Sequence, residues 1–218
     1  MEYDEDGIKI VLIGESGVGK TSIISRFIDN EFDSSSQPSL TGSFFRKNLI
    51  FKDGEKLTFN IWDTAGQEKY RAITKMFYKN AKVAILVYDI SQQHTYDELT
   101  KYWLNSVKEN TNSGIVLVLV ANKSDLAEQE EVNENDARKF AEENKIGFFS
   151  VSAKKNFRIE ELFTHIAEKI TGRNDFRFLG QLEDINEPQK EEEKKTIGKS
   201  TSVKLKASNI NKKKKKCC

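Results

Sequence analysis

Glycine, lysine and hydroxyl residues come together early in the chain, in a pattern that suits the binding of phosphate groups. Residues 14–21 have the spacing G-x-x-x-x-G-K-[ST], directly after an apolar run and directly before a helical pattern. The glycines let backbone N–H groups approach phosphate oxygens, and the positive end of the helix helps to hold the anion. Lys20 can reach the terminal phosphates and is expected to act in catalysis, while the Thr21 hydroxyl can bind Mg²⁺. The candidate nucleotide-binding residues of this loop are Gly14, Glu15, Ser16, Gly17, Val18, Gly19, Lys20, Thr21 and Ser22.

A second polar motif, residues 63–68 (DTAGQE), comes where another apolar run ends. The Asp63 carboxylate can hold Mg²⁺ through water, the Gly66 N–H can meet a γ-phosphate, and Gln67 can orient an attacking water. A turn with a helix cap uses the same residue types, but the position after a phosphate-binding loop favours hydrolysis. We therefore expect Gln67 to be catalytic and Asp63, like Thr21, to bind Mg²⁺.

Two later motifs concern the base of a nucleotide, at residues 122–125 (NKSD) and 152–154 (SAK). The Asp125 carboxylate can accept hydrogen bonds from guanine N1–H and the 2-amino group, whereas adenine would leave this charge unmatched. Asn122 can brace its loop, the Lys123 stem can cover the base, and a backbone N–H of the second motif can reach guanine O6. Taken alone, residues 122–125 would more often form a solvated polar turn, and residues 152–154 mean little by themselves. If the two motifs do bind a base, GTP and GDP are the nucleotides that they select. The candidate base-binding residues are Asn122, Lys123, Asp125, Ser152, Ala153 and Lys154.

Alternating apolar runs and amphipathic stretches must carry these motifs. Residues 52–55 (KDGE) indicate a hairpin turn between the second and third runs, and helical patterns separate the others. The nearly continuous apolar runs at 83–87 and 115–120 are typical of strands covered on both faces. The sequence predicts strands at 8–13, 44–51, 57–62, 83–89, 115–121 and 147–151, and helices at 20–29, 68–79, 95–110, 133–144 and 158–171.

This alternation predicts an α/β domain of three layers, with a six-stranded, mostly parallel sheet and helices on both faces. Ligand-binding loops of such sheets lie at the carboxyl ends of the strands, which is where the motifs fall. The predicted domain spans residues 8–171 and follows a short flexible N-terminus at 1–7. Residues 172–218 are rich in charged and polar side chains, and we expect them to form a disordered tail.

Composition excludes several classes of protein. The chain has 218 residues and a net charge of +1, so its overall charge says nothing about partners. We expect no nucleic-acid partner. Its first residues are acidic and polar, unlike a signal peptide, and no apolar run approaches the roughly 20 residues of a spanning helix. Its two cysteines are adjacent at the end of the chain, so we expect no disulfide framework. These features predict a cytosolic chain that meets a membrane only through its C-terminus.

In order along the chain, GESGVGKT, WDTAGQE, NKSD and SAK resemble the motifs of the Ras-superfamily small GTPases over residues 7–171. The stretches WDTAGQEKYRAI and MFYKNAKVAILVYDIS and the final Cys-Cys are most similar to the Rab branch. The resemblance implies a monomeric P-loop GTPase that regulates vesicle traffic and turns over slowly without an activating protein. It implies as partners a guanine nucleotide exchange factor, a GTPase-activating protein, a GDP dissociation inhibitor or escort protein, and effectors. By position, it also assigns Phe32 to packing against the guanine.

One segment departs from the Rab pattern. Rabs usually read S-T-I-G-x-x-F, whose threonine contacts Mg²⁺ and the γ-phosphate, whereas residues 39–45 read SLTGSFF. Counting back from the hairpin places Leu40 at the threonine position, and counting forward from Lys20 places Ser39 there. Leucine cannot bind a metal ion. We therefore favour Thr41 as the Mg²⁺ and nucleotide ligand of this segment, with Ser39 as the alternative.

The last residues combine a run of lysines, 212–216, with Cys217 and Cys218. A polybasic run beside a lipidated cysteine is a two-signal membrane anchor, and the resemblance implies geranylgeranylation of both cysteines. The expected location is the cytoplasmic face of an intracellular membrane, with cycling to the cytosol. Two other functions stay open. Leu40 would suit a guanine-nucleotide sensor with little hydrolysis, and the phosphate loop alone would suit an ATPase or kinase, which residues 122–125 disfavour.

Overall fold

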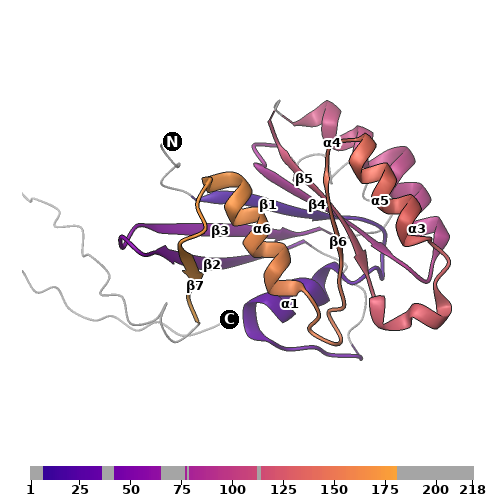
Figure 1. Cartoon of the computed structure of the whole chain (residues 1–218), viewed down its shortest axis with the longest axis horizontal. Helices are drawn as coiled ribbons and strands as arrows, with labels where there is room; N and C mark the ends of the chain where they lie inside the picture. The colour runs from indigo at the N-terminus through magenta and orange to yellow at the C-terminus, as the bar shows by residue number, and fades with distance from the viewer. Residues whose placement is uncertain (1–6, 36–41, 65–76, 78, 112–113, 181–218) are drawn as a thin grey trace, which may run out of the picture. The chain divides into compact units, whose positions relative to one another are not determined.

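A seven-stranded sheet organises the residues that the structure, a computed structural model, describes: 7–35, 42–64, 77, 79–111 and 114–180. The strand order is β6-β5-β4-β1-β3-β2-β7 (Figure 1). The β1–β3, β1–β4, β4–β5 and β5–β6 pairs are parallel, whereas β2 is antiparallel to both of its neighbours. The strands are β1 (Ile8–Ile13), β2 (Ser43–Phe51), β3 (Lys56–Asp63), β4 (Val83–Asp89), β5 (Val116–Asn122), β6 (Gly147–Ser150) and β7 (Phe176–Phe178).

Helices cover both faces of this sheet, as the sequence predicts. Helices α1 and α6 pack on one face, where the Phe27 and Phe163 rings stack with centroids 3.7 Å apart. The opposite face is covered by α3, α4 and α5 around the buried side chain of Trp103. The described helices are α1 (Lys20–Asp29), α3 (Gln93–Glu98), the π-helical segment η2 (Leu99–Trp103), α4 (Leu104–Asn110), the 3₁₀ segment η3 (Ser124–Gln129), α5 (Glu134–Glu143) and α6 (Ile159–Thr171).

Local backbone geometry explains the bounds of the elements nearest the predicted site. Helix α1 begins after Gly19 (φ 95°) and ends at Asn30 (φ 58°), whose N–H donates to the Arg26 carbonyl at 3.1 Å. Asn30 has left-handed backbone, which ends the helix while pairing carbonyl groups of its last turn. The predicted hairpin turn is confirmed between β2 and β3, where Gly54 has φ 88°. The phosphate-binding loop is therefore held between a buried strand and a well-bounded helix.

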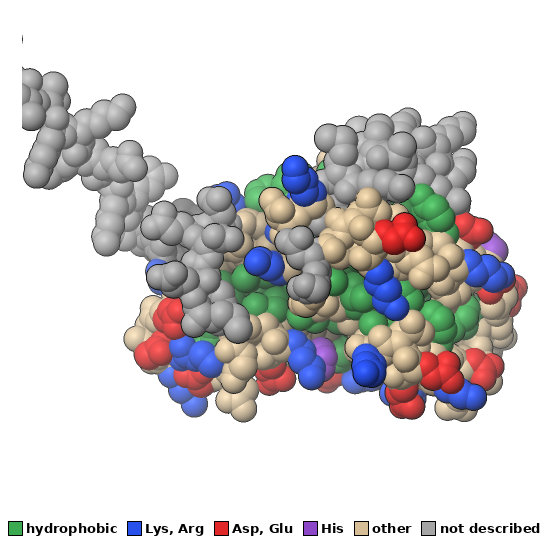
Figure 2. Space-filling view, turned by 90° about the horizontal axis from the view of Figure 1, so that it is seen from above, with side chains coloured by type: hydrophobic (Ala, Val, Ile, Leu, Met, Phe, Trp, Pro, Cys, Tyr) green, Lys and Arg blue, Asp and Glu red, His purple; other side chains and the backbone are tan. Residues whose placement is uncertain are grey.

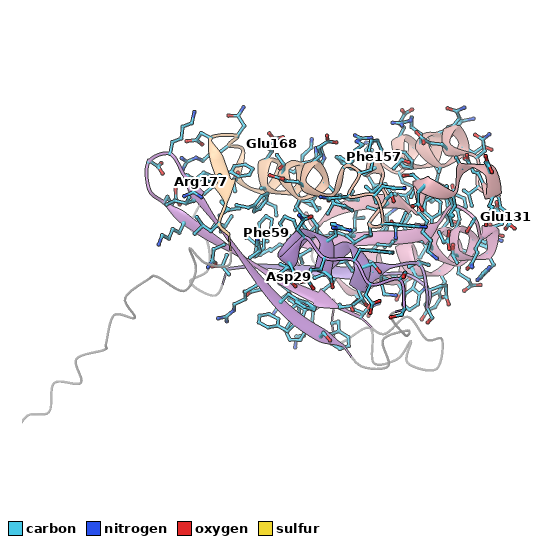
Figure 3. The ribbon with its side chains drawn as sticks, turned by 90° about the horizontal axis from the view of Figure 1, so that it is seen from below. Asp29, Phe59, Glu131, Phe157, Glu168 and Arg177 are labelled. Atoms are coloured by element: carbon cyan, nitrogen blue, oxygen red, sulfur yellow. The ribbon has the colours of Figure 1, made fainter. Side chains whose placement is uncertain are left out.

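The sheet has one strand more than the sequence predicts, because β7 pairs with β2 through Leu49–Phe178, Ile50–Arg177 and Phe51–Phe176. Figure 3 shows β7, marked by Arg177, beside the β2–β3 hairpin. Phe178 packs edge-on against Phe27, with ring centroids 4.9 Å apart. The prediction that a disordered tail begins at residue 172 is therefore wrong for residues 172–180, since aromatic burial and strand pairing hold this segment on the domain.

The predicted helix at 95–110 is three consecutive segments rather than one. Within it, the Leu104 N–H donates to the Leu99 carbonyl five residues earlier, which makes η2 a π-helical turn. This wider turn leaves Trp103 fully buried on the sheet side. Most of the predicted helix at 68–79 lies outside the described residues.

Two further features of the described part concern its surface charges and the length and apolarity of its helices. Positive and negative side chains are interspersed on the face shown in Figure 2. Across the described residues, no helix is both long and apolar enough to cross a membrane.

Candidate functional site

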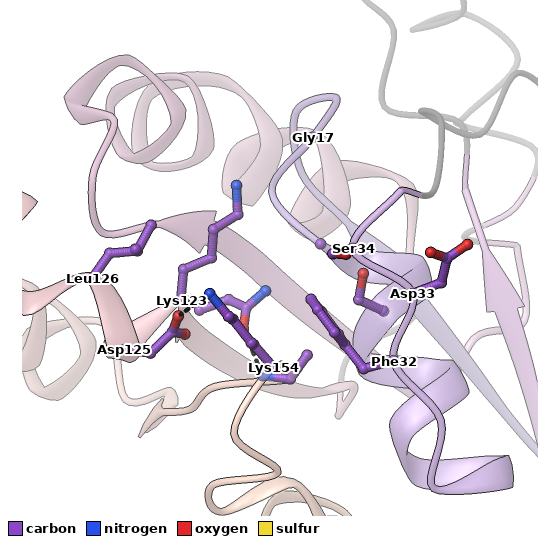
Figure 4. A pocket seen from close by; sticks show the side chains of 12 residues that line it. Gly17, Phe32, Asp33, Ser34, Lys123, Asp125, Leu126 and Lys154 are labelled. Atoms are coloured by element: carbon purple, nitrogen blue, oxygen red, sulfur yellow. Dashed lines mark hydrogen bonds and ion pairs between the residues drawn. The ribbon is translucent and has the colours of Figure 1, made fainter.

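Loops from four places in the sequence line one cavity of about 290 Å³ (Figure 4). The loop between β1 and α1 forms one wall, and the residues that follow α1 form a second. The loops after β5 and β6 close the other side. The lining residues are Gly17, Gly19, Ser22, Phe32, Asp33, Ser34, Asn122, Lys123, Asp125, Leu126, Ala153 and Lys154. The structure therefore brings together the predicted phosphate-binding loop, both predicted base-binding motifs and Phe32.

Two glycines of the phosphate-binding loop lie in close contact with neighbouring groups, one with backbone and one with a side chain. A Cβ atom at Gly14 would collide with the Val87 carbonyl, and one at Gly19 would collide with the Asn122 amide. Gly17 (φ 78°) has nothing within 4 Å of the corresponding position, so its backbone faces open space at the cavity wall. The loop thus forms a cradle of backbone groups, which is the surface that a phosphate chain requires.

Lys20 brings a buried positive charge to this loop. Its side chain is only 5% exposed, and its Nζ atom donates to the Gly14 and Glu15 carbonyls at 2.9 Å each. Burial lowers the pKa of Lys20 to about 8, an effect that the carboxylates of Asp63 and Glu15 partly oppose. The ammonium is therefore placed where phosphate oxygens would recover the electrostatic energy lost on burial.

The two predicted Mg²⁺ ligands of the described part are in direct contact. The Thr21 hydroxyl, in the first turn of α1, donates to Asp63 Oδ2 at 2.5 Å, at the end of β3. Asp63 is fully buried, and its neighbour Thr64 anchors the same strand end by donating to the Leu12 carbonyl. A hydroxyl and a carboxylate are hard oxygen donors, so this pair fits one side of a magnesium site.

The base-binding side is held by hydrogen bonds between its loops. Asn122 Nδ2 donates to the Val18 carbonyl at 2.8 Å, which ties the loop after β5 to the phosphate-binding loop. The Ser152 hydroxyl donates to the Asp125 carboxylate, and Lys154 Nζ lies 4.0 Å from the other Asp125 oxygen. The Ala153 N–H donates to Asn122 Oδ1 at 3.4 Å. In this structure Ser152 therefore positions Asp125, while Lys154 and Phe32 line the cavity itself.

Not every predicted residue lines the cavity directly. Val18 is buried in the core and contributes its carbonyl, and Glu15 receives a hydrogen bond of 3.0 Å from Trp103 Nε1. Ser16 is half-buried in the phosphate-binding loop. Thr41, Gly66 and Gln67, together with Ser39, Leu40, Cys217 and Cys218, lie outside the described residues, so their predicted roles stay predictions.

Three residues of the cavity wall were not predicted. Asp33 and Ser34 directly follow Phe32, and their place in the chain was the only signal that could have indicated them. Leu126 directly follows Asp125 in the first turn of η3. In each case a residue within two positions of a predicted one completes the wall.

Comparison with known proteins agrees with this geometry. A model of the Ras family matches residues 9–172 of the chain. A relative from Schizosaccharomyces pombe (strain 972 / ATCC 24843), the GTP-binding protein ypt3, is 37% identical over 219 residues, which cover 100% of this chain and 98% of that protein.

Proposed function

This chain belongs to the Ras family, and from that premise we propose that it is a Rab-like GTPase, a switch that binds GTP, hydrolyses it to GDP and regulates vesicle traffic. The observation that carries this proposal is the convergence of the phosphate-binding loop, Asp125 and Lys154 on one cavity. The similarity to a GTP-binding protein over nearly the whole of both chains supports the same nucleotide. The alternative, a nucleotide sensor with little hydrolysis, is not favoured by this relationship.

We propose that the residues of the site have separate roles in binding phosphate, metal and base. The loop amides and Lys20 would bind the phosphates, Thr21 and Asp63 would hold Mg²⁺, and Asp125 would select guanine. The metal ion would supply charge neutralisation at the phosphate oxygens. Thr41 and Gln67 are proposed on sequence grounds to complete the metal site and to orient the attacking water. Binding and positioning then provide most of the catalysis, because phosphoryl transfer asks for little covalent chemistry from the protein.

Partners and location form a separate part of the proposal. Regulators of nucleotide exchange and hydrolysis, effectors, and a dissociation inhibitor or escort protein are the partners that a Rab-like switch requires. Prenylation of Cys217 and Cys218, beside the lysines at 212–216, would hold the protein on the cytoplasmic face of an intracellular membrane and let it cycle with the cytosol.

Base selectivity tests the proposal most directly. We expect the parent protein to bind GTP much more tightly than ATP or xanthosine triphosphate. Asp125→Asn should weaken GTP binding by about ten- to a hundredfold, because hydrogen bonds to a charged group contribute about 1.5–3 kcal/mol. The same substitution should improve binding of the xanthine nucleotide, whose base edge accepts from an amide. Titration with fluorescent nucleotide analogues measures both changes.

A matched control is available three residues away. Glu128, an exposed carboxylate of η3, does not line the cavity, so Glu128→Gln should leave both affinities unchanged. If Asp125→Asn bound GTP as tightly as the parent protein, Asp125 would have no contact with the base and the proposed site would be wrong.

A further inference from the structure

A buried carboxylate outside the recognised motifs stands directly behind the nucleotide cavity. Asp89 is the last residue of β4, is 0% exposed, and pairs in register with Asn122 on β5. Its Oδ1 atom accepts hydrogen bonds from the Ser91 N–H at 3.0 Å and from the Ser91 hydroxyl at 2.8 Å. Its own N–H donates to Thr95 Oγ1 at 3.1 Å. Both the backbone and the carboxylate of Asp89 are therefore fixed in one orientation.

The second carboxylate oxygen of Asp89 faces Lys123, a residue of the cavity wall. Lys123 Nζ lies 2.6 Å from Asp89 Oδ2, and the two side chains are 32% and 1% exposed. Among the described residues, Oδ2 accepts no well-directed hydrogen bond, so the attraction to the ammonium is mainly Coulombic. Such a pair is strong when one partner is buried, because solvent screens it little.

This ion pair determines where the Lys123 stem lies. A lysine side chain is long and flexible, and without a partner its ammonium would remain in water. Here the backbone of Lys123 is already constrained (φ 65°) at the start of η3, and Asp89 fixes the far end of the side chain. Figure 4 shows the stem extended along the cavity wall, between Asp125 and the phosphate-binding loop. The aliphatic carbons are thereby pre-organised as a flat apolar surface.

We propose that Asp89 is a positioning residue for nucleotide binding, which acts through Lys123 by holding its stem against the face of the bound purine. This inference rests on the proposed function, because it takes the cavity to be the nucleotide site. Asp89 does not line the cavity. Its effect should therefore be independent of the base edge, in contrast to the effect of Asp125.

Nucleotide release from the full-length protein tests this role. Asp89→Asn should accelerate the release of a fluorescent GDP analogue about tenfold, which corresponds to 1.4 kcal/mol at 25 °C. It should accelerate the release of inosine diphosphate, which lacks the 2-amino group, by the same factor. In the Lys123→Met background, Asp89→Asn should cause no additional acceleration, because the ion pair through which Asp89 is proposed to act has been removed. Asp97→Asn, at an exposed carboxylate that pairs with Lys101 at 2.8 Å, should release GDP at the parent rate.

The outcomes separate this inference from the proposed function. A parent protein that does not retain GDP would contradict the proposed function itself. A parent that retains GDP, with Asp89→Asn at the parent rate or with additive effects of Asp89 and Lys123, would overturn only the positioning role. An effect on GDP alone would place Asp89 at the base edge and also overturn it. If Asp89→Asn does not fold, Ser91→Ala loosens the carboxylate more gently and must accelerate release in the parent but not in Lys123→Met.

Discussion

At the scale of a single residue, Lys20 shows how burial prepares a charge for its ligand. Its pKa is lowered to about 8 by burial, below the usual value of about 10.4 for an unfolded chain. Between these two pH values the unfolded chain binds more protons, so the stability of the nucleotide-free protein should rise with pH across this window. Near pH 8 the folded protein therefore holds both charged and neutral forms of Lys20.

Nucleotide binding should therefore be coupled to proton uptake. A phosphate chain favours the charged form of Lys20 and raises its pKa, so GDP binding near pH 8 should take up a fraction of a proton per molecule. Calorimetric titration in two buffers with different ionisation enthalpies measures this number. Lys20→Arg keeps a permanent charge and should take up no proton. Equal uptake by the parent and by Lys20→Arg would show that another group titrates.

The residues that could be predicted from sequence are those whose chemistry is fixed by local spacing. Gly19 and Asn122 belong to short motifs, and the structure places them in direct backbone-to-side-chain proximity. Asp89 could not be predicted, because nothing near it in the chain indicates a link to Lys123. Likewise, nothing near Trp103 in the chain indicates that its indole nitrogen reaches Glu15. Such links arise from strand register and helix geometry, which a linear pattern does not contain.

At the scale of an element, β7 is held by an unusual concentration of polar contacts around Arg173. The guanidinium pairs with Asp53 and Glu55 of the β2–β3 hairpin at 2.8 Å each, and with Asp175 at 2.9 Å. It also lies 3.9 Å from the ring centroid of Phe51. Hydrogen bonds to Asp175 raise the pKa of Arg173, and the same contacts lower the pKa of Asp175. Arg173 thus orients the chain between α6 and β7.

Arg173→Ala should weaken β7 without disturbing α6. We expect backbone amides at 176–178, and the Lys52 N–H that donates to the Asp175 carbonyl, to exchange with solvent several times faster. Amides of α6 should keep their protection, since that helix is anchored by Leu162, Phe163 and Ile166 in the core. Hydrogen exchange read by mass spectrometry or NMR tests this. Arg138→Ala, which removes an exposed pair with Glu134 on α5, should leave β7 unchanged; equal exchange in both variants would contradict the role of Arg173.

At the scale of the whole molecule, the elements predicted most accurately were those with a strong hydrophobic pattern or with residues that clearly mark their ends. Strands β1 and β4 and helix α1 have the predicted bounds. Strand β7 escaped prediction because three residues cannot display a period, and its stability depends on Phe27 and Phe59, which are distant in sequence. The π-helical turn at 99–103 could not be predicted either, because the buried residues Leu99, Trp103 and Val107 are four apart, a spacing that an α-helix and a π-turn both accommodate.

The proposed membrane attachment would be a property of the whole chain, and the free energies of lipid insertion and of lysine attraction decide which part would govern it. Each buried CH₂ contributes roughly 0.8 kcal/mol, so two twenty-carbon prenyl groups would exceed about 15 kcal/mol if fully inserted. The lysines at 212–216 would add at most about 1 kcal/mol each, screened by salt. Deletion of Cys217 and Cys218 should therefore make the protein cytosolic while GTP binding survives. Cell fractionation tests this, with neutralised lysines as the comparison, for which only the distribution among membranes should shift. A chain without both cysteines that still sediments with membranes would refute lipid anchoring.

The β2–β7 ladder also has a mechanical consequence. Any load carried by the chain beyond Gly180 reaches the domain first through β7, which pairs with β2 at three positions, whereas β2 and β3 pair at eight. Under tension β7 would peel away before the rest of the sheet gives way. Release of residues 173–180 would then lengthen the tether by up to about 26 Å, at roughly 3.3 Å per extended residue. If the C-terminus were held, β7 would therefore be the first part of the described domain to extend.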